Sequence, residues 1–283
     1  MIRDRVRPDW PAYLDRFHSE RPGITEDLLL QCRDPNGLDP YAWLAESVPD
    51  GVTLDLACGS GPMHDRVTGR WVGVDRSTGE LTRAVDRGAG PVVLGDALQL
   101  PLPTASVSSV VCSMALMLIS PVDRALGEIR RVLEPGGTLH VLLPSRRPLR
   151  PSDTWRYLRL YVALGSPARF PPSPLTRRAE RVLDDAGLTV VSTESRRFGY
   201  PLSGPGSARL LVDALYLPGV SDRARERAVA VGAGWKGSEL GIALVRLGLR
   251  RSEPVSTSPR GLPQVTIGHP MTDEDVRSLG DDG

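Results

Sequence analysis

Short apolar runs alternate with amphipathic segments along the middle of the chain. The apolar runs have the length of buried strands and lie at residues 52–57, 71–74, 91–94, 107–113 and 138–143. Two segments between them, 77–87 and 121–133, space their apolar residues as amphipathic helices do. Short buried strands that alternate with helices are typical of a parallel sheet with helices on both faces. The pattern therefore predicts an α/β, doubly wound sheet.

Two further strands follow, but two long segments interrupt the alternation. A helix at 176–186 and strands at 188–194 and 241–249 bring the expected sheet to seven, mostly parallel strands. The interruptions are a proline-rich stretch at 144–175 and a helical insertion at 199–240. Insertions beyond the core strands of α/β enzymes commonly carry binding residues, so we expect both segments to act as lids.

The two ends of the chain differ from this core, which we place at residues 51–251. Residues 1–50 are predicted to form a helical cap, with Thr25 and Asp39 as the N-caps of two short helices. The tail at 252–283 is rich in Ser, Pro, Gly and Asp and has no apolar period. Such a composition predicts a disordered tail.

Composition excludes several classes of protein. The 283 residues carry a net charge of +1, which gives no global attraction to nucleic acid or to anionic lipid. No stretch has the length of a membrane span, and the N-terminus lacks the apolar region of a secretory signal, so we expect a cytoplasmic protein. Three cysteines without C-x-x-C spacing and four scattered histidines predict neither a disulfide framework nor a metal site.

A glycine turn after the first strand and an acid after the second indicate a nucleotide site. The first strand contains Asp55, and the chain then turns at Gly59 and Gly61, where glycines allow a tight turn and a close backbone approach to a ligand. Asp75 ends the second strand, where a carboxylate can accept hydrogen bonds from both ribose hydroxyls of an adenosine. Asp75 could equally be the N-cap of the following helix, and the two roles are compatible.

The residues around the turn narrow the choice of nucleotide. A dinucleotide fingerprint requires a third glycine, where this chain has His64. The P-loop pattern is missing, and the only lysine, Lys236, lies far downstream. Asp55 stands just before the glycines, where a carboxylate would repel a pyrophosphate. The site therefore favours a ligand that carries an ammonium group.

Four motifs in order give the chain a resemblance to a known family. They occupy residues 54–61, 73–77, 95–103 and 128–137. With this order and spacing, the chain resembles the class I S-adenosylmethionine-dependent methyltransferases over roughly residues 40–145. Within that class it is similar to the small-molecule group of the ubiquinone/menaquinone methyltransferases. The resemblance implies a Rossmann-like fold and S-adenosyl-L-methionine as the cofactor.

The resemblance also assigns roles to residues at the strand ends. Asp75 is expected to take the ribose diol, and Asp96 the exocyclic amine of the adenine. Ser113 and Met114 are expected to pass close to the sulfonium, and Tyr41 to reach the cofactor's carboxylate. The expected cofactor-binding residues are Asp55, Ala57, Gly59, Gly61, Asp75, Arg76, Asp96, Ala97, Ser113, Met114 and Tyr41.

Two departures from the family pattern bear on the site. The segment between Gly61 and Trp71 is short, so the helix after the glycine turn is expected to be stubby or distorted. Met117 stands where relatives often carry a histidine, and a thioether cannot move a proton. Either no general base is needed there, or the base comes from elsewhere in the chain.

A general base matters only where the acceptor must lose a proton. The candidates are His18, His140 and Tyr41. We prefer His18 as the catalytic residue, because the run that follows it, residues 21–25, can fold over the cofactor. His140 lies within the fifth strand, where a histidine with satisfied polar atoms is the more common situation.

The acceptor is expected to be a small molecule. Nucleic-acid base methyltransferases of this fold often carry an Asn- or Asp-Pro-Pro-aromatic run after the fourth strand, where this chain has Cys-Ser-Met-Ala. Aromatic residues gather in the two insertions, which favours a flat or lipophilic metabolite. Met117, Trp155 and Tyr161 are the expected acceptor contacts, although the rings could instead pack the insertions onto the core.

The sequence thus predicts methyl transfer to a small-molecule acceptor by in-line displacement, with positioning as the main catalytic device and no metal. No nucleic-acid partner and no membrane span are expected, and the chain should be a monomer or a homodimer. Alternatives stay open. The protein could bind the cofactor without transferring a methyl group, act as a cyclase, or methylate RNA through the basic aromatic stretch at 155–161.

Overall fold

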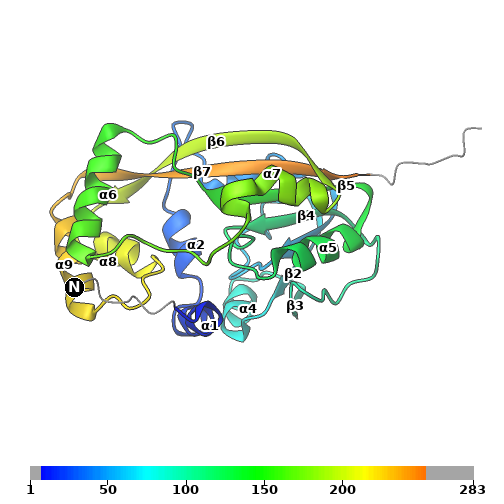
Figure 1. Cartoon of the computed structure of the whole chain (residues 1–283), viewed down its shortest axis with the longest axis horizontal. Helices are drawn as coiled ribbons and strands as arrows, with labels where there is room; N and C mark the ends of the chain where they lie inside the picture. Colours follow the sequence, from blue (N-terminus) through cyan, green and yellow to red (C-terminus); the bar gives the residue numbers. More distant parts are fainter. Residues whose placement is uncertain (1–7, 253–283) are drawn as a thin grey trace, which may run out of the picture. The chain divides into compact units, whose positions relative to one another are not determined.

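A computed structural model describes residues 8–252, apart from the side chains of residues 176–180 (Figure 1). Nearly all of the tail predicted to be disordered, 252–283, lies outside the described residues. The described chain forms one sheet in the order β3-β2-β1-β4-β5-β7-β6. Its strands are β1 (Gly51–Leu56), β2 (Gly69–Asp75), β3 (Val92–Leu94), β4 (Val107–Ser113), β5 (Leu133–Pro144), β6 (Leu188–Leu202) and β7 (Ser238–Arg251).

The predicted seven-stranded, Rossmann-like sheet is confirmed. Strands β1 to β5 pair in parallel, whereas β7 runs antiparallel to both β5 and β6. The chain moves outward from β1 to β2 and β3 and then returns to β4 on the other side of β1. This reversal is a topological switch point, and ligands of open α/β sheets bind beyond the carboxyl ends of the strands there.

Helices cover both faces of the sheet (Figure 1). They are α1 (Trp10–Glu20), α2 (Ile24–Leu29), α3 (Pro40–Ala45), α4 (Thr78–Asp86), α5 (Val122–Val132), α6 (Pro151–Leu164), α7 (Leu175–Asp185), α8 (Pro205–Asp213) and α9 (Asp222–Ala233). Side chains alternate between the faces along β4, as the pleat requires. Val110 and Cys112 join the core made with α5 and α7, and Val111 joins the core made with α2, α3, α6, α8 and α9.

Of the two predicted caps in the N-terminal segment, one is confirmed and one is wrong. The Asp39 carboxylate accepts from two backbone N–H groups of α3, and Pro40 is the first residue of that helix. Thr25 is not an N-cap, because α2 begins one residue earlier, after Gly23. Gly23 has a φ of +75°, a left-handed conformation that glycine adopts at little steric cost.

The stubby helix expected after the glycine turn is absent from the described chain, and residues 57–68 form successive turns instead. Twelve residues separate β1 from β2. A parallel crossover needs about a dozen residues or more, so this connection is at the lower limit and has room only for short turns, one of which is closed by the Val67 N–H donating to the Met63 carbonyl oxygen. The glycine turn is therefore covered by other parts of the chain.

Strands β6 and β7 are longer than the sequence predicts. They span 15 and 14 residues, and they take residues 199–202 and 238–240 out of the predicted insertion. The middle of β6 is polar and exposed, so it lacks an apolar signal. Ion pairs hold it there instead, with Arg196 on Asp34 at 2.8 Å and Arg197 on Asp153 at 2.7 Å. The search for membrane spans, made over the described residues, finds no helix with the length and apolar character to cross a bilayer.

Candidate functional site

Backbone strain gathers where the carboxyl ends of β1, β2 and β4 meet. Ala57 follows β1 directly and has a φ of +54°, and Met114 follows β4 directly with a φ of +57°. A non-glycine residue in this left-handed region costs about 1–3 kcal/mol and persists where the surrounding structure enforces it, commonly at functional sites. The strained pair supports a site at the switch point, where the sequence predicts one.

Asp75 holds the glycine turn from the end of β2. Its Oδ2 accepts from the Gly59 N–H over 2.9 Å, and its Oδ1 accepts from the Ser77 N–H over 2.8 Å. Ser77, and not Asp75, is the N-cap of α4, because the Ser77 hydroxyl accepts from the Glu80 N–H. The carboxylate is therefore fixed by two backbone donors at the edge of the sheet.

The two glycines of the turn let other segments approach it closely. Gly59 and Gly61 have φ values of +54° and +75°. A Cβ on Gly61 would meet the Cβ of Ala89 at 2.8 Å, and one on Gly59 would overlap the carboxylate of Glu26. The absence of side chains at this turn thus allows α2 to lie directly on it.

Glu26 of α2 is the residue that occupies this position. Its Oε1 accepts from the Ser60 N–H at 3.3 Å, and only 8% of the residue is exposed. The sequence did not predict a role for Glu26, because an acid in the first turn of a helix is fully explained by the helix dipole. No sequence signal places α2 on the glycine turn, since the two segments are 34 positions apart.

Glu80 of α4 connects α1 and α2 to the same site. Its Oε1 lies 3.0 Å from His18 Nδ1, and its Oε2 accepts from the Gly23 N–H at 2.8 Å. His18 Nε2 lies 3.2 Å from the Tyr216 hydroxyl. The predicted base His18 therefore stands at the edge of the site, oriented on both ring nitrogens. Glu80 was not expected to take part, and Tyr216 was expected only as one of the aromatic residues of the insertions.

Four carboxylates are buried together at this edge. Their residues are between 1% and 8% exposed and are Glu26, Asp55, Asp75 and Glu80. Burial, followed by repulsion from Glu80, raises the pKa of Glu26 to about 7. Burial is also the main cause that raises the pKa values of Asp55 and Asp75. Because the charged forms lack a full set of cationic partners, a positively charged ligand would stabilise them.

The pKa of His18 reflects the same group of acids. Burial alone would lower this pKa, but the hydrogen bond and the charge of Glu80 outweigh it. The charges of Glu26 and Asp75 add to the rise, so the pKa of His18 lies above its ordinary value. Burial raises the pKa of the Tyr216 hydroxyl as well, so that group remains a neutral hydrogen-bonding partner.

Tyr41 and Asp55 lie beneath the turn. Tyr41 is 2% exposed, and burial together with the charges of Glu26 and Asp55 raises the pKa of its hydroxyl well above the ordinary value. Oδ2 of Asp55 accepts from the indole N–H of Trp71 at 3.3 Å. Asp55 is one of the four acids, and Tyr41 is close enough to be affected by its charge. The buried hydroxyl of Tyr41 stays protonated, so it is not available as a base.

The residues expected around an adenine lie farther out. Asp96 is exposed, and its Oδ1 accepts from the Leu98 N–H at 2.9 Å, while Ala97 is half-buried. Arg76, expected against the face of the adenine, is exposed and forms an ion pair with Asp15 of α1 at 2.7 Å. This pair shows that α1 lies beside the end of β2.

The end of β4 contributes a buried hydroxyl. Oγ of Ser113 is buried without a hydrogen-bond partner among the described residues, so it is available to a ligand. Met117 is 4% exposed. The candidate base His140 does not join this group, because its ring nitrogens contact Ser47 and Thr138. Burial and the charge of Arg246 lower its pKa to about 4.

The described part of the chain holds three buried thiols, and its His, Cys, Asp and Glu side chains form no metal-binding cluster. Cys32, Cys58 and Cys112 are free and buried. Burial raises the pKa values of Cys32 and Cys112 to about 12, so these thiols stay protonated. Among residues 8–252, no group of three His, Cys, Asp or Glu side chains is arranged to hold a metal ion.

The predicted acceptor contacts in α6 do not lie together with the acids. Trp155 is 51% exposed and contacts Trp235 and Arg159 at the surface. Tyr161 is half-buried beside Tyr157. The aromatic residues of the insertions thus form separate groups, and the ring next to the acids is Tyr216, which contacts Phe17, His18 and Phe170.

Comparison with known protein families finds a match over the parallel strands whose ends form this site. The methyltransferase domain family matches residues 54–141. A demethylmenaquinone methyltransferase of Thermobifida fusca is 35% identical over 125 residues, which are 41% of this chain and 52% of that protein. A 2-phytyl-1,4-naphtoquinone methyltransferase of Synechococcus elongatus is 33% identical over 122 residues, 38% of this chain and 52% of that protein. The chain thus spans about half the length of these curated relatives.

Solved structures share the fold at low sequence identity. A putative methyltransferase of Bacillus halodurans has a TM-score of 0.51 and 16% identity, and the match covers 76% of this chain and 99% of that one. A phosphoethanolamine N-methyltransferase of Haemonchus contortus, solved with phosphomonomethylethanolamine and S-adenosylhomocysteine, has a TM-score of 0.53 and 16% identity. That match covers 87% of this chain and 61% of the other.

Proposed function

Because the chain resembles the class I S-adenosylmethionine-dependent methyltransferases, of the kind that includes the quinone methyltransferases, we propose that it transfers a methyl group from S-adenosyl-L-methionine to a small-molecule acceptor. The observation that carries the proposal is the buried group of four carboxylates around the glycine turn. S-adenosyl-L-methionine carries a sulfonium and an ammonium group, and both match a site of negative charge.

The residues present fit this cofactor on several counts. Two glycines and two strained residues form a tight turn at the strand ends, and the carboxylate of Glu26 lies on it. The Ser113 hydroxyl lacks a partner within the described chain, and the Asp75 carboxylate is held by backbone donors at the strand end. The residues that would hold the cofactor are Asp55, Ala57, Gly59, Gly61, Asp75, Arg76, Asp96, Ala97, Ser113, Met114 and Tyr41, and we add Glu26.

The cofactor, when bound, supplies an electrophilic methyl group. The chain supplies position and exclusion of water. Well-oriented reactants can gain roughly 7–11 kcal/mol from positioning alone. Segment 21–26 lies on the glycine turn through Glu26 and is held to Glu80 of α4 through Gly23, and it would separate the reacting groups from solvent. We propose that residues 1–50 act as a cap and that the two insertions act as lids.

His18 is the residue that we propose as the base where the acceptor must lose a proton. Its Nδ1 contact with Glu80 orients the ring and stabilises its cationic form, and Nε2 points to the Tyr216 hydroxyl. A base of this kind typically adds about 10²–10⁴-fold to a rate. Its raised pKa makes the neutral form scarcer at low pH, so a dependence on His18 would appear as activity that increases with pH.

For the acceptor, we propose a flat or lipophilic metabolite. The quinone methyltransferases among the relatives support this class. Met117, Trp155 and Tyr161 stay our predicted acceptor contacts, with the weakest support for Trp155 because half of it is exposed. Tyr216 is the aromatic residue that the geometry adds, since its hydroxyl contacts the proposed base.

Calorimetry with S-adenosyl-L-methionine and, separately, with NAD tests the proposal directly. We expect binding of the first and none of the second. Tight binding of NAD alone would overturn the methyltransferase proposal in favour of a dehydrogenase. Incubation with methyl-labelled cofactor and demethylmenaquinone then separates transfer from mere binding, because a cofactor-binding protein or a cyclase would release no S-adenosylhomocysteine.

A further inference from the structure

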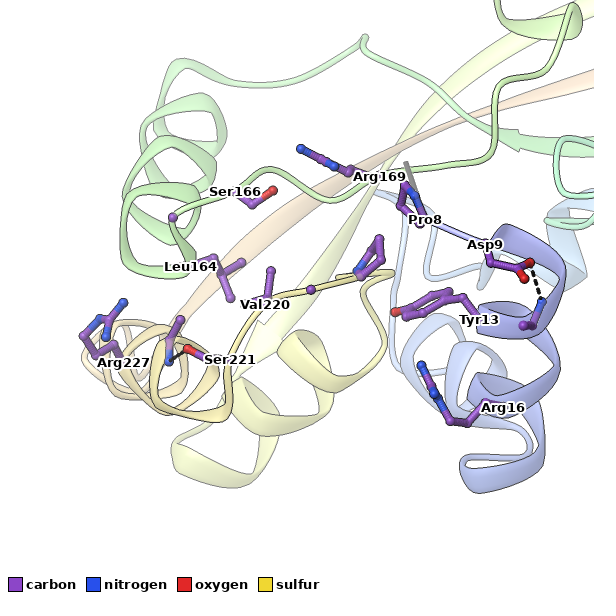
Figure 2. A pocket seen from close by; sticks show the side chains of 15 residues that line it. Pro8, Asp9, Tyr13, Arg16, Leu164, Ser166, Arg169, Val220, Ser221 and Arg227 are labelled. Carbon is purple, nitrogen blue, oxygen red and sulfur yellow. Dashed lines mark hydrogen bonds between the residues drawn. The ribbon is translucent and has the colours of Figure 1, made fainter. Parts of the chain in front are cut away.

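A cavity of about 760 Å³ lies between α1 and the part of the chain that carries α6 and α9 (Figure 2). Its walls come from the first half of α1, the loop after α6 at residues 165–169, and the loop before α9 at residues 218–221. Ligand-binding pockets typically have volumes of roughly 300–1,000 Å³. The cavity therefore has the size of a small-molecule site, and the four motifs of the sequence do not include its lining.

The charged groups of the lining are mostly cationic. Arg16, Arg169 and Arg227 face one acid, Asp9. Asp9 is occupied as the N-cap of α1, where its Oδ1 accepts from the Ala12 N–H at 3.2 Å. Figure 2 shows Arg16 on α1 and Arg227 on α9 at opposite sides, with Arg169 on the loop between α6 and α7.

Two of these arginines are free to bind a ligand. The guanidinium groups of Arg16 and Arg169 form no ion pair and no hydrogen bond with any residue in the described range. Arg227 donates one N–H to the Ala163 carbonyl oxygen at 3.1 Å and keeps its other donors. A planar guanidinium matches carboxylate and phosphate oxygens with paired hydrogen bonds.

The remaining lining combines an apolar surface with a helix N-terminus. Tyr13, Leu164 and Val220 supply the apolar part. Ser221 is the N-cap of α9, a helix of 12 residues, and the positive end of a helix dipole favours an anion. Arginines, a helix N-terminus and apolar walls in one cavity suit a molecule with an anionic group on an apolar body.

A smaller neighbouring cavity of about 210 Å³ has a weaker charge imbalance. It shares Tyr13 and Arg16 with the larger cavity, but Glu20 and Asp222 accompany its three arginines. The excess of positive charge is therefore greater in the larger cavity, where three arginines accompany one acid.

We propose that the larger cavity binds the anionic end of the methyl acceptor, a carboxylate or a phosphate. This inference rests on the proposed function and adds a class of acceptor to it. Two rings in succession, Tyr13 and Tyr216, lie between the cavity and the proposed base. The Tyr13 ring lines the cavity and lies 6.4 Å from the Tyr216 ring, whose hydroxyl lies 3.2 Å from His18 Nε2.

The same loop links the cavity to these rings. The Arg169 N–H donates to the Tyr216 carbonyl oxygen at 3.1 Å, so the residue that would bind the anion also fixes the backbone of the ring beside His18. An acceptor anchored by its anion in the cavity would have to pass Tyr216 to present its nucleophilic atom to the methyl group. The acceptor is thus elongated, with the anion and the nucleophile at different ends.

Three matched probes test the anionic specificity: 3-phenylpropionate, 3-phenylpropyl phosphate and the neutral 3-phenylpropan-1-ol. Titrations of the full chain are followed by NMR of the arginine Nε–H signals, which are assigned from the variants. We expect both anions to bind at least tenfold more tightly than the alcohol and to shift the signals of Arg16 and Arg169. The tighter of the two anions identifies the group as carboxylate or phosphate.

Substitutions then locate the binding site. Arg169→Gln and Arg16→Gln should each weaken anion binding about five- to tenfold and change alcohol binding less than twofold. The matched control is Arg223→Gln, an exposed arginine of α9 outside the cavity lining, which should leave all three affinities unchanged. Thermal unfolding of each variant checks the fold, and a melting variant is replaced by Arg169→Lys, which keeps the charge and should retain most of the anion affinity.

The outcomes separate this inference from the proposed function. If S-adenosyl-L-methionine binds but the alcohol binds as tightly as both anions, the anionic acceptor class is overturned and the methyltransferase proposal stands. If Arg223→Gln weakens the anions as much as Arg169→Gln does, the cavity is not their site. If the anions bind through Arg169 and the cofactor does not bind, the proposed function fails while the anion site remains.

Discussion

The acid group at the glycine turn and the arginine-lined cavity differ in both charge and burial. The four carboxylates are at most 8% exposed, whereas Arg16 and Arg227 of the cavity are exposed to solvent. In the first region the carboxylates are buried close together at low dielectric, so the pKa values of Glu26, Asp55 and Asp75 are raised. In the second region water still reaches the charges, so they act mainly by attracting and orienting a ligand.

This difference assigns the two regions to two reactants of opposite charge. A cationic cofactor relieves the repulsion among buried acids, and an anionic acceptor is attracted by free guanidinium groups. An anionic acceptor would meet like charges in the acid group, and the net positive charge of the cofactor disfavours the arginine cavity. In the proposed arrangement, the separation of charge between the two regions would place the two reactants on either side of the Tyr13 and Tyr216 rings.

The largest expected effect comes from Glu26→Gln on stability. The pKa of Glu26 is about 7 in the folded protein against 4.5 ordinarily, so the wild type loses stability as pH rises from about 4.5 through 7. Glutamine does not titrate. The free energy of unfolding of the variant minus that of the wild type should therefore be roughly 2–3 kcal/mol larger at pH 8 than at pH 4. Urea denaturation at both pH values measures this, and a difference that does not change with pH would contradict it.

Asp75→Ala tests the acidic region as a cofactor site. Loss of a hydrogen-bonded charged group should weaken S-adenosyl-L-methionine binding by about 1.5–3 kcal/mol. The matched control is Asp86→Ala, an exposed acid at the other end of α4, which should leave the affinity unchanged. Calorimetry supplies the affinities. Equal affinity in both variants, with the fold intact, would remove Asp75 from the site.

The next largest effect is a difference in how salt changes ligand binding in the two regions. Exposed charges are screened strongly, because the Debye length falls to about 3 Å at 1 M ionic strength, and buried charges are screened much less. Raising sodium chloride from 50 to 500 mM should therefore weaken 3-phenylpropionate binding about three- to fivefold. Cofactor binding should change less than twofold. The reverse order would mean that the cofactor site is the more open of the two.

The smallest effect is expected from Trp155→Ala. Half of this side chain is exposed, and neither cavity is lined by it, so stability should change by no more than about 0.5 kcal/mol. Cofactor affinity should not change. A rise in acceptor KM without loss of stability would support the proposed acceptor contact on α6, and an unchanged KM would remove Trp155 from the acceptor contacts. Chemical denaturation and steady-state kinetics with demethylmenaquinone separate these results.

The sheet could be predicted because each of its core strands carries a local signal. β4 matches its predicted bounds, 107–113, since it is buried on both faces and reads as a continuous apolar run. β6 was predicted only to residue 194, because the polar residues 195–197 and the glycine and proline at 199 and 201 that follow do not distinguish a strand from a loop. The register of β6 comes from pairing with β7, and that pairing is not local in sequence.

The site was predictable only where strand ends define it. Asp75 and the glycine turn follow from their places after β2 and β1. Glu26 and Tyr216 come from α2 and from the loop after α8, which reach the edge of the sheet through tertiary packing. Their roles depend on which segment covers the glycine turn, and a single sequence holds no pattern for that choice.

The position of Glu26 on the glycine turn has a kinetic consequence. A ligand of this turn has to displace a carboxylate that the chain itself has placed there, against the Ser60 N–H. Binding then requires the Glu26 side chain to move first, and where this movement is slow the association rate levels off at high ligand concentration. The same step slows departure, which gives a bound ligand a long residence time.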